Sequence, residues 1–133
     1  MNTDKKERAR NPILLEEQLT EKVLAAAFKV QNTLGCGFLE KVYENAMAVE
    51  LRRLGILFEQ QKALQVRYNG AIVGEYLADL VIDTRVIVEC KAATQIDPVH
   101  EAQLINYLKA TGLRVGMLLN FGRPKVQYRR LVV

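Results

Sequence analysis

Three charged residues stand in two short segments that otherwise read as buried β-strands. Glu89 and Lys91 lie in the segment Val86–Ala92, whose other residues are Val, Ile, Cys and Ala, and Asp79 lies in an apolar segment shortly before it. Buried charges are costly unless they are paired or bind a metal. Because side chains alternate along a strand, Glu89 and Lys91 share one face. Two carboxylates and an ammonium group in such surroundings indicate a site for chemistry.

A particular hairpin register brings the two carboxylates together. If Asp79 pairs with Glu89, the turn between the strands is a three-residue loop, Asp83–Arg85, which is a common hairpin connection. The two Cβ atoms would then be about 5 Å apart. A two-residue loop would place the carboxylates on opposite faces unless a bulge restored the register. We expect the shared face and, with Lys91 beside it, a site for a hard divalent cation such as Mg²⁺.

The alternative to a metal site is a cross-strand ion pair in which Lys91 neutralises Glu89. Taken alone, a Glu-x-Lys sequence in a strand favours this structural role. Asp79 weakens that interpretation, because three charges then need partners and only one of them is positive.

Two predicted helices carry further polar groups. In the helix expected over residues 39–54, steps of 100° per residue align Glu40 with an apolar stripe. In the helix expected after Pro98, Gln103 and Tyr107 lie one turn apart and can touch, on an arc that also contains His100. Tyr107 taken alone is more typical of a core residue, and His100 is not assigned to a metal.

The order of elements predicts a mixed sheet flanked by helices. The first helix is expected to run from about Leu14 or Thr20 to Leu34, with Thr20 as a candidate N-cap and Gly35 as the C-cap. The second helix is expected to have a wide apolar face of Leu39, Val42, Ala46 and Val49, with Tyr43, Met47, Leu51 and Leu54 beside them. The strands are expected at 63–68, 72–81, 85–92, 115–120 and 126–132, with a third helix at 99–111. This α-α-β-β-β-α-β-β order is typical of an α/β or α+β fold with a mixed central β-sheet.

The composition describes one globular domain. The chain has 133 residues, of which 50% are hydrophobic and 26% charged, and its length suits a single domain. Residues 1–12 read as a charged flexible tail and residues 13–133 as the domain. No apolar run approaches the ~20 residues of a membrane span, and the first ten residues lack the apolar core of a secretory signal. Two cysteines are too few for a disulfide scaffold, so we expect a cytoplasmic protein.

The charges are unevenly distributed along the chain. Residues 102–133 contain six basic and no acidic side chains, whereas residues 11–101 contain nine basic and thirteen acidic ones. A basic segment beside an acidic one would suit a phosphate-binding surface next to a metal site, although surface charge also fluctuates along any chain. The basic candidates for nucleic-acid contact are Lys109, Arg114, Arg123, Lys125, Arg129 and Arg130.

Several motifs together resemble a known family. The signature Gly-x-x-Glu-x-x-Tyr of the GxxExxY proteins is present as Gly37-Phe38-Leu39-Glu40-Lys41-Val42-Tyr43. The remaining motifs follow in order: Ala78-Asp79, Val88-Glu89-Cys90-Lys91, His100 to Lys109, and Asn120-Phe121-Gly122. From about Leu19 to Val133 the chain therefore resembles the GxxExxY family, which looks like a branch of the PD-(D/E)XK nuclease superfamily.

The resemblance implies a restriction-endonuclease-like core and a role for each matching residue. Asp79, Glu89 and the backbone carbonyl of Cys90 would hold Mg²⁺ or Mn²⁺, and Lys91 would be the catalytic lysine. Glu40 would match an acid that many members carry near the metal on the first core helix. The polar positions on the helix that follows the lysine strand are matched by Gln103 and Tyr107. Ala78 stands where many members have a proline, which is a mild departure.

The function that the resemblance implies is metal-dependent hydrolysis of phosphodiester bonds in nucleic acid, with DNA as the favoured substrate. Two alternatives stay open: a catalytically silent nucleic-acid- or partner-binding module, and a non-nucleolytic enzyme on the same scaffold. The intact Asp79, Glu89 and Lys91 favour the nuclease. The small size and the lack of a recognition domain favour dependence on a homodimer or a partner protein.

Overall fold

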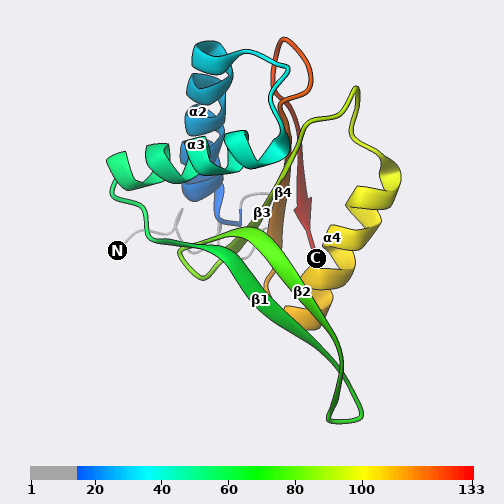
Figure 1. Ribbon diagram of the computed structural model, residues 1–133. Coiled ribbons are helices and arrows are strands. Elements are labelled where there is room, and N and C mark those ends of the chain that lie inside the picture. The colour runs from blue at the N-terminus through cyan, green and yellow to red at the C-terminus, as the bar shows by residue number, and fades with distance from the viewer. Residues whose placement is uncertain (1–14) are drawn as a thin grey trace.

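The computed structural model describes residues 15–133, so the tail predicted for residues 1–12 lies outside the described residues. The helices are α2 (Glu17–Leu34), α3 (Glu40–Arg53) and α4 (Pro98–Thr111). The strands are β1 (Phe58–Tyr68), β2 (Ala71–Ile82), β3 (Val86–Lys91), β4 (Val115–Asn120) and β5 (Gln127–Val132). This order confirms the predicted α+β fold (Figure 1).

The five strands form one mixed sheet in the order β1-β2-β3-β4-β5. Neighbouring strands are antiparallel except β3 and β4, which are parallel. A parallel pair needs a crossover connection, and α4 supplies it. Figure 1 shows α2 and α3 on one side of the sheet and α4 on the other. No helix in residues 15–133 has the length and apolar character needed to cross a membrane.

Strand β3 separates two hydrophobic cores. Val86, Val88 and Cys90 pack into the core beneath α2 and α3, whereas Ile87 packs into the core beneath α4. The alternation that the sequence predicted for this strand is therefore confirmed. Glu89 has the parity of Ile87, which places it on the α4 side of the sheet.

Helix α3 buries only one side of its predicted apolar face. Tyr43, Met47 and Leu51 are buried as predicted, whereas Leu39 is 81% exposed and Val49 is half exposed. The helix is therefore rotated away from the predicted centre of that face, and the expectation that Leu39 and Val49 lie in the core is wrong. The rotation is fixed by Tyr43, because its hydroxyl donates to the Gly35 carbonyl at 2.6 Å and its ring stacks on Phe121.

The start of helix α2 also differs from the prediction. The helix begins at Glu17, and the Thr20 hydroxyl donates to the Glu17 carbonyl at 3.0 Å, so Thr20 lies within the first turns and is no N-cap. A threonine hydroxyl can bond to a preceding carbonyl inside a helix as readily as it caps one. The predicted end at Leu34 is confirmed, and Gly35 follows with a φ of 71° and its N–H bonded to the Gln31 carbonyl.

The loop that follows β3 is fastened by a buried amide. The Asn120 side chain accepts from the Ala93 N–H and donates to the Ala93 carbonyl, both at 2.9 Å. The same oxygen accepts from the Gly122 N–H at 3.0 Å. Because Asn120 is opposite Lys91 in the β3–β4 ladder, these bonds fix the backbone immediately after Lys91.

The backbones of Gly122 and Ala93 lie close together, and substitution of Gly122 tests this contact. A Cβ at Gly122 would lie 2.2 Å from the Ala93 carbonyl oxygen, so Gly122→Ala must move backbone and should cost more than about 2 kcal/mol of unfolding free energy. Gly74 is a matched control in a strand, because its Cβ would approach nothing closer than 3.9 Å. Gly74→Ala should leave stability equal or higher. Equal urea midpoints for both variants would contradict the close approach.

Candidate functional site

The β2–β3 hairpin has the predicted register. Leu80 pairs with Val88, Val81 with Ile87 and Ile82 with Val86, which leaves the three-residue loop Asp83–Arg85. All three pairs belong to the predicted register, in which Asp79 would lie opposite Glu89. The ladder ends at the pair Leu80–Val88, one step before Asp79 and Glu89, so the two acids lie where the strands separate.

Where the strands separate, the Asp79 side chain takes the place of a backbone carbonyl as hydrogen-bond acceptor. Its carboxylate accepts the Cys90 N–H at 2.9 Å. In an extended strand the N–H and C=O of one residue point to the same edge, so the Cys90 carbonyl also faces the gap that Asp79 occupies. Asp79 is partly buried and its pKa is raised by burial, opposed by the Cys90 N–H bond and reinforced by the nearby Glu44 carboxylate.

Glu89 is buried on the α4 side of the sheet, with 6% of its surface exposed. Its carboxylate accepts a hydrogen bond from the Tyr76 hydroxyl. Burial raises its pKa to about 7, although the Lys91 charge and a bond from the Asp79 backbone act in the opposite direction. The carboxyl group therefore lacks a cation sufficient to keep it ionised at low cost.

Lys91 lies beside Glu89 without closing an ion pair. It is half-buried at the end of β3, and its charge lowers the pKa of Glu89. No ion pair within the described part of the chain includes the Lys91 ammonium. The structural alternative, in which Lys91 neutralises Glu89 directly, is therefore not what the geometry shows.

A residue that the sequence analysis missed, Glu44, is the acid of α3 that reaches this cluster. Only 4% of it is exposed, and it accepts bonds from the Lys41 ammonium at 2.9 Å and from the Gln61 amide at 2.8 Å. Gln61 also donates to Asp79 at 3.3 Å. Burial would raise the pKa of Glu44, but the amide bonds and Lys41 together lower it.

Glu40 does not join these contacts. It is exposed at the first turn of α3, and no hydrogen bond or ion pair links it to another described residue. Its charge still acts on Glu89, as the smallest influence on the pKa of that group. Glu44, one turn later, makes the hydrogen-bonded contact with Gln61, which also donates to Asp79, and the position of Glu40 facing the two acids stays a prediction. A helical wheel does not separate the two acids, because Glu40 and Glu44 each lie 20° from the buried Leu51; they differ in their distance from the start of the helix.

Helix α4 contributes one of its two predicted residues to the surroundings of Glu89. The Tyr107 ring stacks on the Tyr76 ring, with centroids 3.5 Å apart and 7° between the planes. Gln103 is exposed and forms no side-chain hydrogen bond with another described residue. Tyr76 was not predicted, although it precedes Asp79 by three residues in the same strand.

The six basic candidates do not form one surface. Arg129 pairs with Glu101 of α4 at 3.1 Å, while Arg130 binds Thr20 and the Leu15 carbonyl on the α2 side. Lys109 and Arg114 lie near the opposite end of the sheet from Lys91, where Arg114 binds the Val133 carbonyl. The two that remain at the Lys91 end, in the β4–β5 loop, are Arg123 and Lys125.

The donor set suits a hard divalent cation. Among residues 15–133 no three acidic, histidine or cysteine side chains form a metal cluster. Mg²⁺ typically takes only one or two protein carboxylates and keeps several waters, so Asp79, Glu89 and the Cys90 carbonyl fit it. The raised pKa values of both acids show that an additional positive charge would be favourable there.

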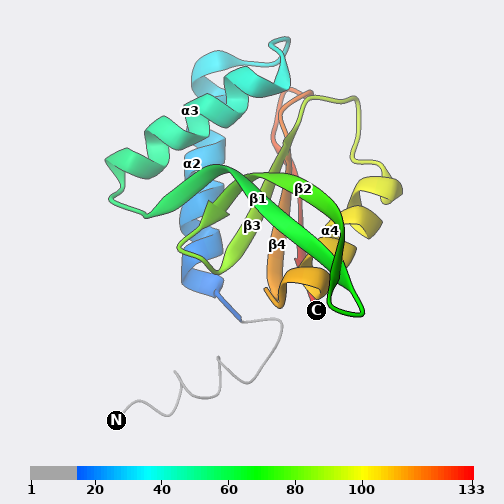
Figure 2. The ribbon, with the colours of Figure 1, turned by 60° about the horizontal axis from the view of Figure 1, so that its bottom comes forward.

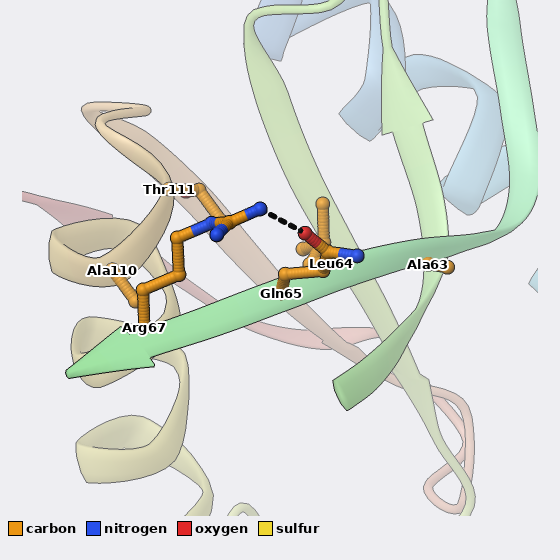
Figure 3. A pocket seen from close by; sticks show the side chains of 6 residues that line it. All are labelled: Ala63, Leu64, Gln65, Arg67, Ala110 and Thr111. Carbon is orange, nitrogen blue, oxygen red and sulfur yellow. Dashed lines mark hydrogen bonds between the residues drawn. The ribbon is translucent and has the colours of Figure 1, made fainter. Parts of the chain in front are cut away.

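A cavity lies away from the acidic cluster. It has a volume of about 450 Å³ and lies between β1 and the last turn of α4, as Figure 2 shows for these elements and Figure 3 for the side chains. Arg67 spans it and donates to the Gln65 amide oxygen at 3.0 Å. No candidate site residue lines it, so the acidic cluster and not this cavity is the candidate site.

Comparison with known proteins identifies the family. The PD-(D/E)XK nuclease superfamily matches residues 17–131, and the chain belongs to that superfamily. The chain is also similar to the crystal structure of a protein called SSO0001, with a TM-score of 0.52 and 16% identity over 95% of this chain and 61% of that one. At this identity the similarity concerns the fold alone. The search of the curated proteins finds no match.

The raised pKa of Glu89 predicts how stability depends on pH without metal. Its pKa is about 7 in the folded chain against an ordinary 4.5, so the folded state binds more protons between these values. Unfolding free energy should therefore fall as pH rises from about 4.5 to about 7, by on the order of 3 kcal/mol. Glu89→Gln should remove this loss and be more stable than wild type at pH 8.

Urea unfolding with chelator from pH 5 to pH 8 measures this difference. Glu75→Gln is the matched control, because Glu75 is an exposed acid of the same hairpin and its substitution should leave the pH dependence unchanged. If Glu89→Gln follows the wild-type curve across this range, Glu89 is not the buried group described here.

Proposed function

We propose that this chain is a metal-dependent nuclease that hydrolyses phosphodiester bonds of nucleic acid, with DNA as the favoured substrate, and that it belongs to the GxxExxY branch of its superfamily. The observation that supports this most strongly is the strand separation at Asp79. There the Asp79 carboxylate accepts the Cys90 N–H, and Glu89 is the preceding residue of β3. The Lys91 charge acts on Glu89, although no ion pair of the described residues includes Lys91. A structural ion pair would need only Glu89 and Lys91.

Each group at this position has a distinct proposed role. Asp79, Glu89 and the Cys90 carbonyl would hold Mg²⁺ or Mn²⁺. The ion would polarise a phosphate oxygen and lower the pKa of a bound water. Lys91 is free to orient the attacking water and to stabilise the negative charge that develops on the phosphorus oxygens. Glu44, whose pKa is lowered by its amide bonds and Lys41, adds negative potential that favours a cation.

Substrate contacts would come from the same end of the sheet. Arg123 and Lys125 are exposed in the β4–β5 loop, and Arg123 donates to the Thr94 carbonyl in the loop after β3. Cations at such positions bind backbone phosphates without reading sequence. Gln103 and Tyr107 remain candidates for positioning the substrate from α4.

The metal and the lysine can be separated by experiment. Wild type and Lys91→Ala should both melt at a higher temperature when Mn²⁺ is added, because binding to the folded state stabilises it, whereas Asp79→Ala should show little shift. Only the wild type should cleave DNA with metal present. The expected loss for Lys91→Ala is at least about a hundredfold in rate, as for removal of one transition-state donor.

Calorimetry and a gel assay on single- and double-stranded DNA and RNA measure these outcomes. An equal Mn²⁺ shift in Asp79→Ala and wild type would contradict the metal site. A shift in the wild type without cleavage of any nucleic acid would instead support a binding module on the same fold.

The two acids of α3 should differ in their effect on the metal. Glu44→Gln should weaken Mn²⁺ binding several-fold, because it removes a charge adjacent to Asp79. Glu40→Gln should have the smaller effect, because Glu40 is exposed and screened by solvent. Isothermal titration of both variants measures the difference, and a larger loss for Glu40→Gln would restore Glu40 as the acid of the site.

A further inference from the structure

One side chain outside the predicted site holds Glu89 directly. The Tyr76 hydroxyl donates to Glu89 Oε1. A carboxylate has about four lone-pair positions, so positions remain for a cation after this donor is satisfied. The bond comes from a residue of β2 and therefore links Glu89 of β3 to the strand that carries Asp79.

The Tyr76 ring is itself fixed from the other layer. It stacks on Tyr107 with centroids 3.5 Å apart, and both rings pack against the core that lies beneath α4. Helix α4 thus sets the position of the hydroxyl, and the hydroxyl sets the position of the carboxylate. If Tyr76 served only in packing, its ring would be sufficient and its hydroxyl would not be needed.

We propose that Tyr76 is a positioning residue that orders Glu89 for metal binding; this rests on the metal site of the proposed function. A carboxylate held in one orientation loses little freedom when it binds a cation. Residues that orient a metal ligand in this way typically change metal affinity by 10- to 100-fold when they are removed. Tyr76 would act through Glu89 and would not contact the metal or the substrate.

The test compares Mn²⁺ affinity in the full-length wild type, Tyr76→Phe and Tyr68→Phe. Tyr76→Phe keeps the stacked ring and removes only the hydroxyl, so the dissociation constant for Mn²⁺ should rise about tenfold. Tyr68 lies on the same hairpin, is 70% exposed and serves as the matched control, whose affinity should equal that of the wild type. Electron paramagnetic resonance of free Mn²⁺ gives the affinities, and thermal melting shows that each variant is folded at the temperature used.

The outcomes separate this inference from the proposed function. If Asp79-dependent Mn²⁺ binding is present and Tyr76→Phe binds as tightly as wild type, the positioning role is overturned and the metal site stands. The same holds if Tyr76→Phe loses melting temperature but no affinity, because that marks a purely structural hydroxyl. If the wild type binds no Mn²⁺ through Asp79, the proposed function fails, and the role of Tyr76 fails with it.

Discussion

The hydrogen bond from the Cys90 N–H to the Asp79 carboxylate determines the rest of this site. It lies one step beyond the last backbone pair of β2 and β3, at the position where a ladder bond would otherwise form. A side-chain oxygen replaces a backbone oxygen, so the N–H stays satisfied while the strands separate. Without this bond, a buried backbone donor would be left unpaired at a cost of about 1–3 kcal/mol.

The acids Asp79 and Glu89 lie where strands β2 and β3 separate. Gln61 of β1 donates to both Asp79 and Glu44, which links the acid of β2 to the acid of α3. Glu44 pairs with the Lys41 ammonium, whereas Asp79 and Glu89 accept hydrogen bonds from amide, hydroxyl and backbone donors and form no ion pair with another described residue. Such donors lower the cost of burial without neutralising the charge, which leaves the raised pKa values of Asp79 and Glu89. Binding of a cation beside these two acids would therefore be energetically favourable.

Much of the fold could be predicted from the sequence, because local rules and tertiary packing agree there. Strand alternation located Cys90 and Glu89 in opposite layers, and the turn length fixed the register that places Asp79 at the gap. The rotation of α3 could not be predicted in this way. Both of its faces carry apolar residues, and the choice between them is made by Tyr43 through its contacts with Gly35 and Phe121, which are distant in sequence or outside the helix.

Glu44 and Tyr76 were not predicted from the sequence. Glu44 lies one turn into α3 and its charge acts on Asp79, whereas Glu40 is the first residue of the helix and is exposed. Tyr76 and the dispersal of the basic residues depend on how β2 and β5 pack against α4 and α2, which no local pattern reports. The order of the motifs, in contrast, was sufficient to predict the superfamily, because the spacing of Asp79, Glu89 and Lys91 in the sequence does not depend on how the helices pack.

The central claim is that the gap at Asp79 binds one hard divalent cation. The most direct measurement is an anomalous difference map from crystals of the wild type soaked in Mn²⁺. We expect a peak within coordination distance of the Asp79 and Glu89 carboxylates and the Cys90 carbonyl, and its loss in Asp79→Ala. A map without a peak at this gap, or with Lys91 closed onto Glu89 in its place, would contradict the account.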